Sequence, residues 1–167
     1  MREITRELEL AIPVESTFAL LHTPSAVRGW WSAARAIIAP REGGLWVATW
    51  GADEDAPEYI TAARILAWHP PHRLLLGAFE YFMAAGGLPF DADFETEFTV
   101  APSPRGSILR VHQTGFPDEA VADEFYAGCE RGWEATLEGV RRYVAERSGS
   151  RATIDFRAAA GRLTDRR

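Results

Sequence analysis

The longest regular pattern in this sequence is a helical one, between residues 118 and 147. Its small or apolar residues recur every three or four positions and form one continuous face: Val121, Phe125, Gly128, Cys129, Gly132, Trp133, Thr136, Leu137, Val140 and Val144. Charged residues occupy the other face. Pro117 and the two acids after it are typical of a helix start, and we expect Ser148 and Gly149 to end the helix.

Three glycines inside this helix are not explained by helix propensity. Gly128, Gly132 and Gly139 each cost about 1 kcal/mol relative to alanine in a helix interior. We therefore expect packing against other elements to hold the helix in place. Gly128 and Gly132 lie on the apolar face, where a missing side chain either lets a strand approach or leaves room for a ligand.

The rest of the chain is dominated by strand patterns. Alternating apolar and polar residues predict a first strand at residues 4–12, followed later by five or six antiparallel strands. Between them, helical spacing predicts two short helices, one from Val14 to about His22 and one leading to Trp30 and Trp31. The later strand segments are residues 35–39, 45–50, 59–68, 73–82, 93–100 and 107–114.

This order of elements predicts the α+β class. The expected fold is a curved antiparallel sheet wrapped around a long C-terminal helix, with two short helices after the first strand. A curved sheet that closes on a single helix leaves a space between the two. An apolar space of that kind, of roughly a few hundred Å³, is typical of a ligand site.

Composition and charge exclude several classes of protein. The chain has 167 residues, 47% of them hydrophobic and 25% charged, which is typical of one globular domain. No apolar run predicts a membrane span, and the amino terminus lacks the core of a signal peptide. The one cysteine cannot form an internal disulfide and fits a reducing compartment, so we expect a cytoplasmic protein.

The charge is divided unevenly between the body and the C-terminal end. Residues 147–167 contain six Arg against two Asp, a net charge of +4, so residues 1–146 carry −10 of the total of −6. An acidic body argues against a nucleic-acid groove. We expect a domain at residues 1–147 and a basic tail at residues 148–167 that is loose or a short surface helix.

Six short motifs, in order along residues 4–146, resemble a known family. They are Ile12-Pro13-Val14-Glu15 with Phe18, Trp30-Trp31, Gly43-Gly44, Trp68-His69-Pro70-Pro71-His72-Arg73-Leu74, Gly115-Phe116, and Gly132-Trp133 with Leu137. Together they resemble the START-like (SRPBCC) helix-grip domains. They are most similar to the branch named after the activator of the heat-shock protein 90 ATPase. The tail after Gly149 lies outside the resemblance.

The resemblance implies a sheet of about seven strands around the C-terminal helix and an inner apolar cavity. Members bind lipids, sterols, polyketides or plant hormones, and some are aromatases or cyclases. The family's name implies a chaperone partner. Where many relatives carry His before the Gly-Phe pair, this chain has Gln113, which cannot act as a general base.

Candidate ligand-binding residues are the aromatic side chains of the predicted inner surfaces, with a few polar groups. They are Trp31, Trp46, Trp50, Tyr59, Tyr81, Phe94, Phe98, Gln113, Phe125 and Trp133. Arg64 and Glu80 are further polar candidates. Both faces of their strands are apolar, so the sequence does not decide whether these two side chains point inward.

Other reactive residue types do not form a recognisable motif. The four histidines are too scattered for a metal site, and we expect no cofactor. Glu95 and Glu97 alternate with apolar residues and are interpreted as outer, solvated side chains. Cys129 has no neighbouring base in the sequence and is interpreted as a small apolar residue.

Three hypotheses of function follow. The first is a binding module for a small, mostly apolar or aromatic molecule. The second is a cyclase-, aromatase- or hydrolase-type enzyme, which needs at least two titratable groups in the cavity, such as Glu80, Tyr81 or Arg64. The third is a co-chaperone-like interaction protein. A homodimer through an edge strand or through the loop at residues 84–91 stays open.

Overall fold

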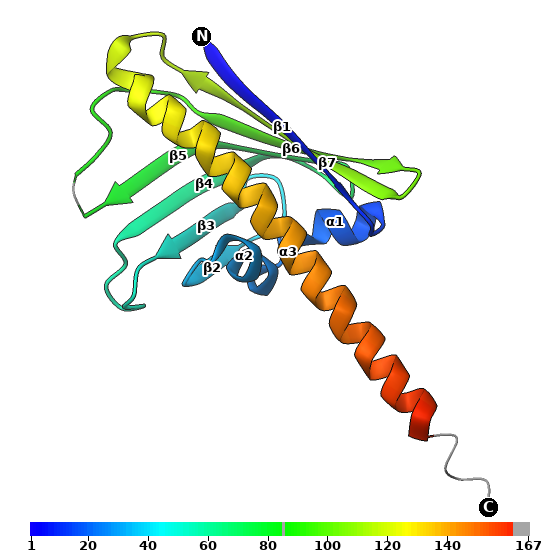
Figure 1. The fold of residues 1–167 in the computed structure, drawn as a ribbon. Helices are drawn as coiled ribbons and strands as arrows, with labels where there is room; N and C mark the ends of the chain where they lie inside the picture. Colours follow the sequence, from blue (N-terminus) through cyan, green and yellow to red (C-terminus); the bar gives the residue numbers. More distant parts are fainter. Residues whose placement is uncertain (85, 162–167) are drawn as a thin grey trace, which may run out of the picture.

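Seven strands, two short helices, a 3₁₀ turn and one very long helix make up the described part of the chain (Figure 1). The computed structural model describes residues 1–84 and 86–161, with side chains up to residue 149. The elements are β1 (Arg2–Leu10), α1 (Val14–Leu20), α2 (Pro24–Trp31), β2 (Arg35–Ile38), β3 (Leu45–Trp50), β4 (Tyr59–His69), β5 (Arg73–Met83), β6 (Glu95–Ser103), β7 (Gly106–Phe116), the 3₁₀ turn η1 (Ala120–Ala122) and α3 (Asp123–Gly161).

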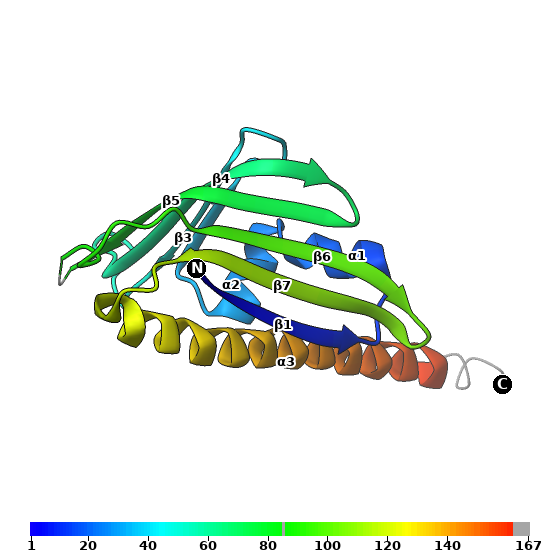
Figure 2. The same cartoon turned by 90° about the horizontal axis from the view of Figure 1, so that it is seen from above.

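The seven strands form one antiparallel sheet in the order β1-β7-β6-β5-β4-β3-β2. Neighbouring strands are joined by hairpins, except that β1 pairs with β7, the strand farthest from it in sequence. Helix α3 runs along the concave side of the sheet, close to β1 and β7, as the view in Figure 2 shows. The predicted α+β helix-grip fold, with two short helices after the first strand, is confirmed.

The corner formed by α1 and α2 is fixed by tryptophan indoles. The Nε1–H of Trp30 donates to the carbonyl oxygen of Leu20 at 2.9 Å, and that of Trp46 donates to Leu21 at 2.9 Å. Both carbonyls lie at the end of α1, where helix carbonyl groups lack partners within the helix. The indoles therefore satisfy these carbonyls while their rings fill the core.

Helix α3 differs from the prediction at both ends. It begins at Asp123, after the 3₁₀ turn, instead of at residue 118, and it continues through Ser148 and Gly149 to Gly161. The expected end at Ser148 and Gly149 is wrong because glycine is a weak helix breaker and no proline follows it. In Figure 1 the last part of α3 extends beyond the sheet. The division into domain and tail stays a prediction, and residues 162–167 lie outside the described residues.

A bulge in β5 changes which of its side chains face inward. Leu74 and Leu76 are buried, but beyond Ala78 the inward residues are odd-numbered, beginning with Phe79 and Tyr81. Ala78 has a φ of +48°, in the left-handed region that a residue with a Cβ rarely adopts. The pairing of β4 with β5 shifts its register at this place. The bulge therefore turns Tyr81 toward the side of the sheet on which Tyr59 of β4 lies.

Candidate functional site

A cavity of about 1080 Å³ lies between the first half of α3 and the inner face of the sheet. Side chains from α2, β3, β4, β5, β6, β7 and α3 line it, together with the loop after β5. The volume exceeds the few hundred Å³ expected from the sequence and matches the upper range of known ligand sites. The described interior is thus not filled by side chains at this place.

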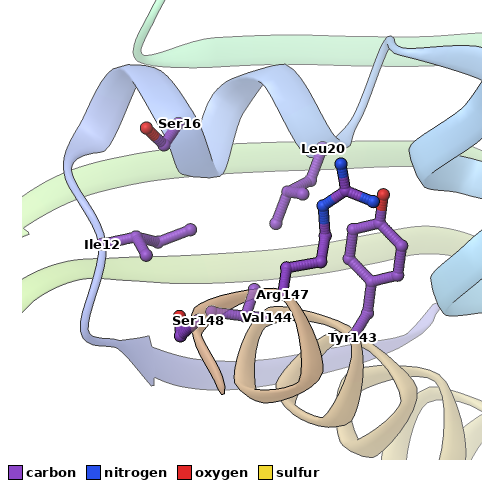
Figure 3. A pocket seen from close by; sticks show the side chains of 7 residues that line it. All are labelled: Ile12, Ser16, Leu20, Tyr143, Val144, Arg147 and Ser148. Atoms are coloured by element: carbon purple, nitrogen blue, oxygen red, sulfur yellow. The ribbon is translucent and has the colours of Figure 1, made fainter. Parts of the chain in front are cut away.

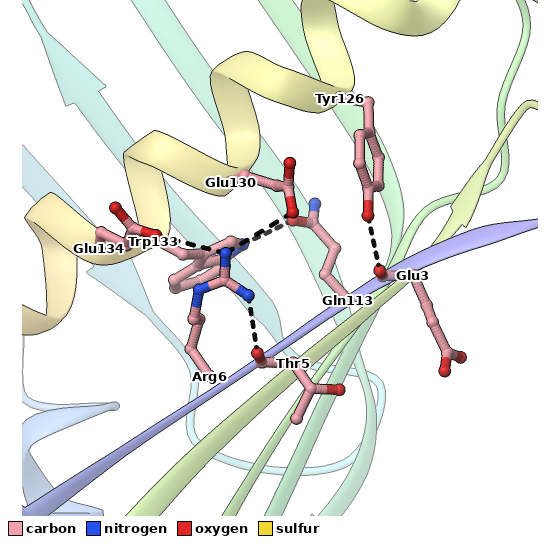
Figure 4. Close-up of polar contacts among 8 residues, drawn as sticks. All are labelled: Glu3, Thr5, Arg6, Gln113, Tyr126, Glu130, Trp133 and Glu134. Atoms are coloured by element: carbon pink, nitrogen blue, oxygen red, sulfur yellow. Dashed lines mark hydrogen bonds and ion pairs between the residues drawn. The ribbon is translucent and has the colours of Figure 1, made fainter.

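One side of α3 is attached to β1, and the cavity lies on its other side. Arg6 of β1 pairs with Glu130 at 3.6 Å and Glu134 at 3.4 Å, and the Tyr126 hydroxyl donates to the carbonyl oxygen of Glu3 at 3.0 Å (Figure 4). These surface contacts are individually weak, but together they hold the helix at the sheet edge.

Two glycines of α3 face the open space. A Cβ added at Gly128 or Gly132 would meet no atom within 4 Å, and both residues line the cavity. By contrast, a Cβ at Gly139 would lie 2.3 Å from the carbonyl oxygen of Trp30. The first two glycines therefore leave room, whereas Gly139 allows α2 and α3 to approach each other.

Nine of the ten predicted site residues line the cavity: Trp31, Trp46, Trp50, Tyr59, Tyr81, Phe98, Gln113, Phe125 and Trp133. The tenth, Phe94, is 2% exposed and lies behind the lining, with its ring centroid 5.5 Å from that of Phe125 and 6.0 Å from that of Tyr81. Phe94 supports the wall without being part of it.

Stacked and edge-on indoles form one wall of the cavity. The ring of Trp31 stacks on that of Trp133 at 6.3 Å, with 24° between the planes, and meets Trp50 edge-on at 5.0 Å. The Trp50 Nε1–H donates to the carbonyl oxygen of Trp31 at 3.2 Å, which fixes the edge-on arrangement. Rigid aromatic surfaces of this kind offer a large apolar contact area to a flat molecule.

A buried polar pair lies in this aromatic surface. The indole Nε1–H of Trp133 donates to Oε1 of Gln113 at 2.6 Å (Figure 4), and the two residues are 8% and 5% exposed. Because an indole nitrogen can only donate, the oxygen of the amide must face it. The Gln113 amide therefore has one defined orientation.

The other polar groups deep in the cavity are held in their neutral forms. Burial raises the pKa of the Cys129 thiol to about 11, and burial likewise raises the pKa of the Tyr59 and Tyr81 hydroxyls above their usual value. A hydrogen bond with the Thr61 side chain lowers the pKa of Tyr59 and so partly offsets the increase caused by burial. Near neutral pH these three groups can donate hydrogen bonds, but none of them carries a charge.

Arg64 and Glu80 do not point into the cavity. Both are exposed on the outer face of the sheet, so their candidacy as polar site residues is wrong. Arg64 lies near the carbonyl oxygen of Gly43 at 3.5 Å. The charged residues that do line the cavity, Glu124 and Arg131, are exposed on α3, at the mouth.

Several lining residues were not among the predicted site residues. They are Thr61, Leu76, Phe79, Met83, Leu88, Pro89, Phe90, Thr96, Val121, Glu124, Gly128, Cys129, Arg131, Gly132 and Thr136. The alternation of side chains along a strand could have identified two of them. Thr61 lies two residues from Tyr59, and Thr96 lies two residues from Phe98. Leu88 and Phe90 belong to an irregular loop, where no periodic pattern indicates direction.

A second, smaller hollow of about 390 Å³ lies between α1 and the middle of α3 (Figure 3). Its walls include Leu20 of α1 and Val144 of α3. The guanidinium of Arg147 lies 5.1 Å from the ring centre of Tyr143, an arrangement that favours a cation–π contact. The polar residues that line this hollow, Ser16, Arg147 and Ser148, are exposed, so it offers no buried polar group comparable to Gln113.

The described residues give no sign of a metal centre or a membrane helix. Within residues 1–84 and 86–149, whose side chains are described, no three side chains of His, Cys, Asp or Glu come together as a group that could hold a metal ion. In the same residues, no helix has the length and apolarity needed to cross a membrane. The expectation that no cofactor is needed stays a prediction.

The family model described as "Activator of Hsp90 ATPase homolog 1-like protein" matches residues 11–145. The chain belongs to this family. The match begins directly after β1 and ends within α3, before Gly149. The resemblance inferred from the six motifs is thereby confirmed, and with it the helix-grip superfamily. No curated protein matches the sequence.

Several solved structures share this fold. Protein MLL2253 from Mesorhizobium loti is 21% identical, with a TM-score of 0.70 over 87% of this chain and 98% of that one. Protein NE0264 from Nitrosomonas europaea is 15% identical, with a TM-score of 0.70 over 88% and 96%. CalU16 from Micromonospora echinospora is 17% identical, with a TM-score of 0.60 over 95% and 86%. At these identities the likeness concerns the fold alone.

Proposed function

We propose that this protein binds a small, mostly apolar molecule in the cavity between α3 and the sheet. The observation that carries the proposal is the combination of an unfilled volume of about 1080 Å³ with a lining rich in aromatic rings. Leaving such apolar surface in contact with water costs about 25 cal/mol per Å², so a ligand that covers it is favoured. The proposed setting is the cytoplasm, because the chain has one cysteine.

The enzyme alternative receives less support. It needs two titratable groups that converge inside the cavity, and its named candidates Arg64 and Glu80 are exposed on the other face of the sheet. Tyr81 does line the cavity, but its raised pKa keeps the proton on the hydroxyl. A general base needs a pKa near the working pH, which this tyrosine does not have.

A chaperone partner, which the family's name suggests, has no specific support in the described residues. Exposed apolar side chains occur on the outer face of the sheet, among them Ile37, Leu45 and Leu66. Scattered exposed apolar residues are ordinary on protein surfaces and do not by themselves indicate a partner.

Native mass spectrometry of freshly purified protein tests the proposal. We expect a fraction of the protein to carry one additional small molecule, which is released and identified after denaturation. The Gly132→Leu variant, which places a side chain in the open space beside α3, should lose that adduct. Gly149→Leu adds the same side chain to the same helix at an exposed position outside the lining and should keep it. An adduct of equal abundance in all three proteins would contradict the proposal.

A further inference from the structure

The fixed orientation of the Gln113 amide has a consequence for the kind of ligand that fits. We propose, on the basis of the binding function above, that the ligand is an uncharged planar molecule bearing a hydrogen-bond acceptor oxygen, such as a ketone or quinone carbonyl. The amide nitrogen of Gln113 donates to that oxygen. Trp133 is a positioning residue, because it decides which end of the amide is available.

The contact with Trp133 decides which end of the Gln113 amide is left for a ligand. Oε1 of Gln113 accepts the Trp133 indole N–H at 2.6 Å, so the amide cannot turn without leaving that buried N–H unpaired. An unpaired buried donor costs about 1–3 kcal/mol. The NH₂ end is therefore the one that remains for a ligand, and in the described part of the chain it has no protein partner at hydrogen-bond distance.

A ligand reaches the Gln113 amide nitrogen through the cavity. Among the described residues, Ser103 Oγ is the buried side-chain atom that is both sealed and without a partner. The Gln113 nitrogen is not sealed in this way, although its residue is only 5% exposed. Gln113 lines the cavity, so the cavity gives this nitrogen its access. An unpartnered donor at a largely apolar surface selects ligands that carry an acceptor.

The distribution of charge in the lining favours an uncharged ligand. The lining residues that carry charge, Glu124 and Arg131, are exposed on α3, whereas the aromatic interior around Gln113 contains neutral groups. Burying an ionised carboxylate or amine without a partner of opposite charge is strongly unfavourable. The stacked Trp31 and Trp133 rings favour a flat apolar body. An uncharged planar molecule satisfies both conditions.

Three tricyclic compounds of nearly equal size test the proposal: fluorene, with no polar group, fluorenone, with an acceptor oxygen, and carbazole, with a donor N–H. Their affinities for the full-length protein are measured by isothermal titration calorimetry. The quantity measured in each variant is the affinity ratio of fluorenone or carbazole to fluorene. Differences in hydration between the compounds cancel when this ratio is compared between variants. A carboxylate derivative of fluorenone tests the requirement for neutrality.

We expect Gln113→Met to lower the fluorenone-to-fluorene ratio about tenfold relative to the wild type, the effect of one net hydrogen bond. Trp133→Phe keeps an aromatic ring but frees the amide to turn. It should lower the fluorenone ratio and raise the carbazole ratio, a reversal that a purely structural role for Trp133 would not produce. The carboxylate should bind at least about tenfold more weakly than fluorenone in the wild type.

The outcomes separate this inference from the proposed function. If fluorene binds but the two ratios do not change in Gln113→Met and Trp133→Phe, acceptor recognition is wrong and apolar binding remains. If the carboxylate binds as tightly as fluorenone, the requirement for an uncharged ligand is wrong. If none of the compounds binds to the wild type, the proposed function fails together with this inference.

Discussion

Cys129 lines the cavity from the inner face of α3, so the pKa of its thiol reflects how far the cavity excludes water. Burial raises the pKa of its thiol to about 11 from an ordinary value of 9.0. The thiolate is the reactive form, so this shift lowers the reactive fraction about a hundredfold near pH 8. The thiol therefore behaves as a small apolar group, as the sequence predicted, and not as a nucleophile.

Alkylation by iodoacetamide measures this effect directly. In the folded protein the rate should keep rising between pH 8 and pH 10, whereas in urea-unfolded protein it should level off above about pH 9. Because the folded state favours the protonated thiol, its contribution to stability is complete below the unfolded pKa and is lost as pH rises through about 11. Cys129→Ala should lack that part of the alkaline loss. A folded-state rate that levels off near pH 8 would contradict the account.

At Ala78 the direction of the following side chains can no longer be predicted from the sequence. Strand parity places Trp46, Trp50 and Phe98 on the inner face, and the structure agrees. In β5 the same rule fails beyond Ala78, because a bulge with φ of +48° reverses the parity. Alanine gives no sign of a left-handed position, so the outward direction of Glu80 could not be read from the sequence.

At the scale of one element, α3 combines two uses of glycine in a single helix. At Gly132 an added Cβ meets no atom within 4 Å, but at Gly139 it lies 2.3 Å from the Trp30 carbonyl oxygen. Helical spacing alone correctly placed Gly128 and Gly132 on the inner face. It could not predict the close contact at Gly139, because that contact depends on how closely α2 approaches α3.

Two alanine variants should therefore have opposite effects on stability. Gly132→Ala should raise the free energy of unfolding by about 1 kcal/mol, the difference in helix propensity. Gly139→Ala should lower it by about 1–3 kcal/mol, because the backbone of α2 must move away. Equilibrium unfolding in urea measures both. Equal changes in the two variants would show that neither glycine has the packing role described.

The extent of α3 was harder to predict than its face. The pattern of apolar residues weakens after Val144, and Ser148 and Gly149 suggested an end, yet the helix continues to Gly161. Local propensity allowed this continuation, because alanine and arginine are good helix formers and are frequent in residues 151–161. A stop signal without proline is therefore a weak prediction.

At the scale of the whole molecule, the family match ends at residue 145, near the predicted boundary of the domain. We predict that a chain ending at Gly149 folds as the full chain does. Its free energy of unfolding should differ by less than about 1 kcal/mol, because no part of the described cavity lining lies beyond that residue. Urea unfolding of the shortened and full-length proteins checks this. Loss of a cooperative transition would show that the last turns of α3 are part of the domain.

The element order and the alternation of apolar residues were sufficient to predict the fold class, the inner face of α3 and most of the aromatic lining. They could not predict the size of the cavity, which depends on how far the β1 contacts of Arg6 and Tyr126 hold α3 from the remaining strands. They also could not predict the Gln113–Trp133 pair, because its partners are 20 residues apart on different elements.

The central claim is that the cavity binds an apolar molecule, and titration with the neutral dye Nile red tests it most directly. The account predicts saturable one-to-one binding to the wild type and to Gly149→Leu, with a rise in dye fluorescence. Gly132→Leu, which fills the space beside α3, should bind at least about tenfold more weakly. Absence of saturable binding to the wild type, or equal binding by all three proteins, would contradict it.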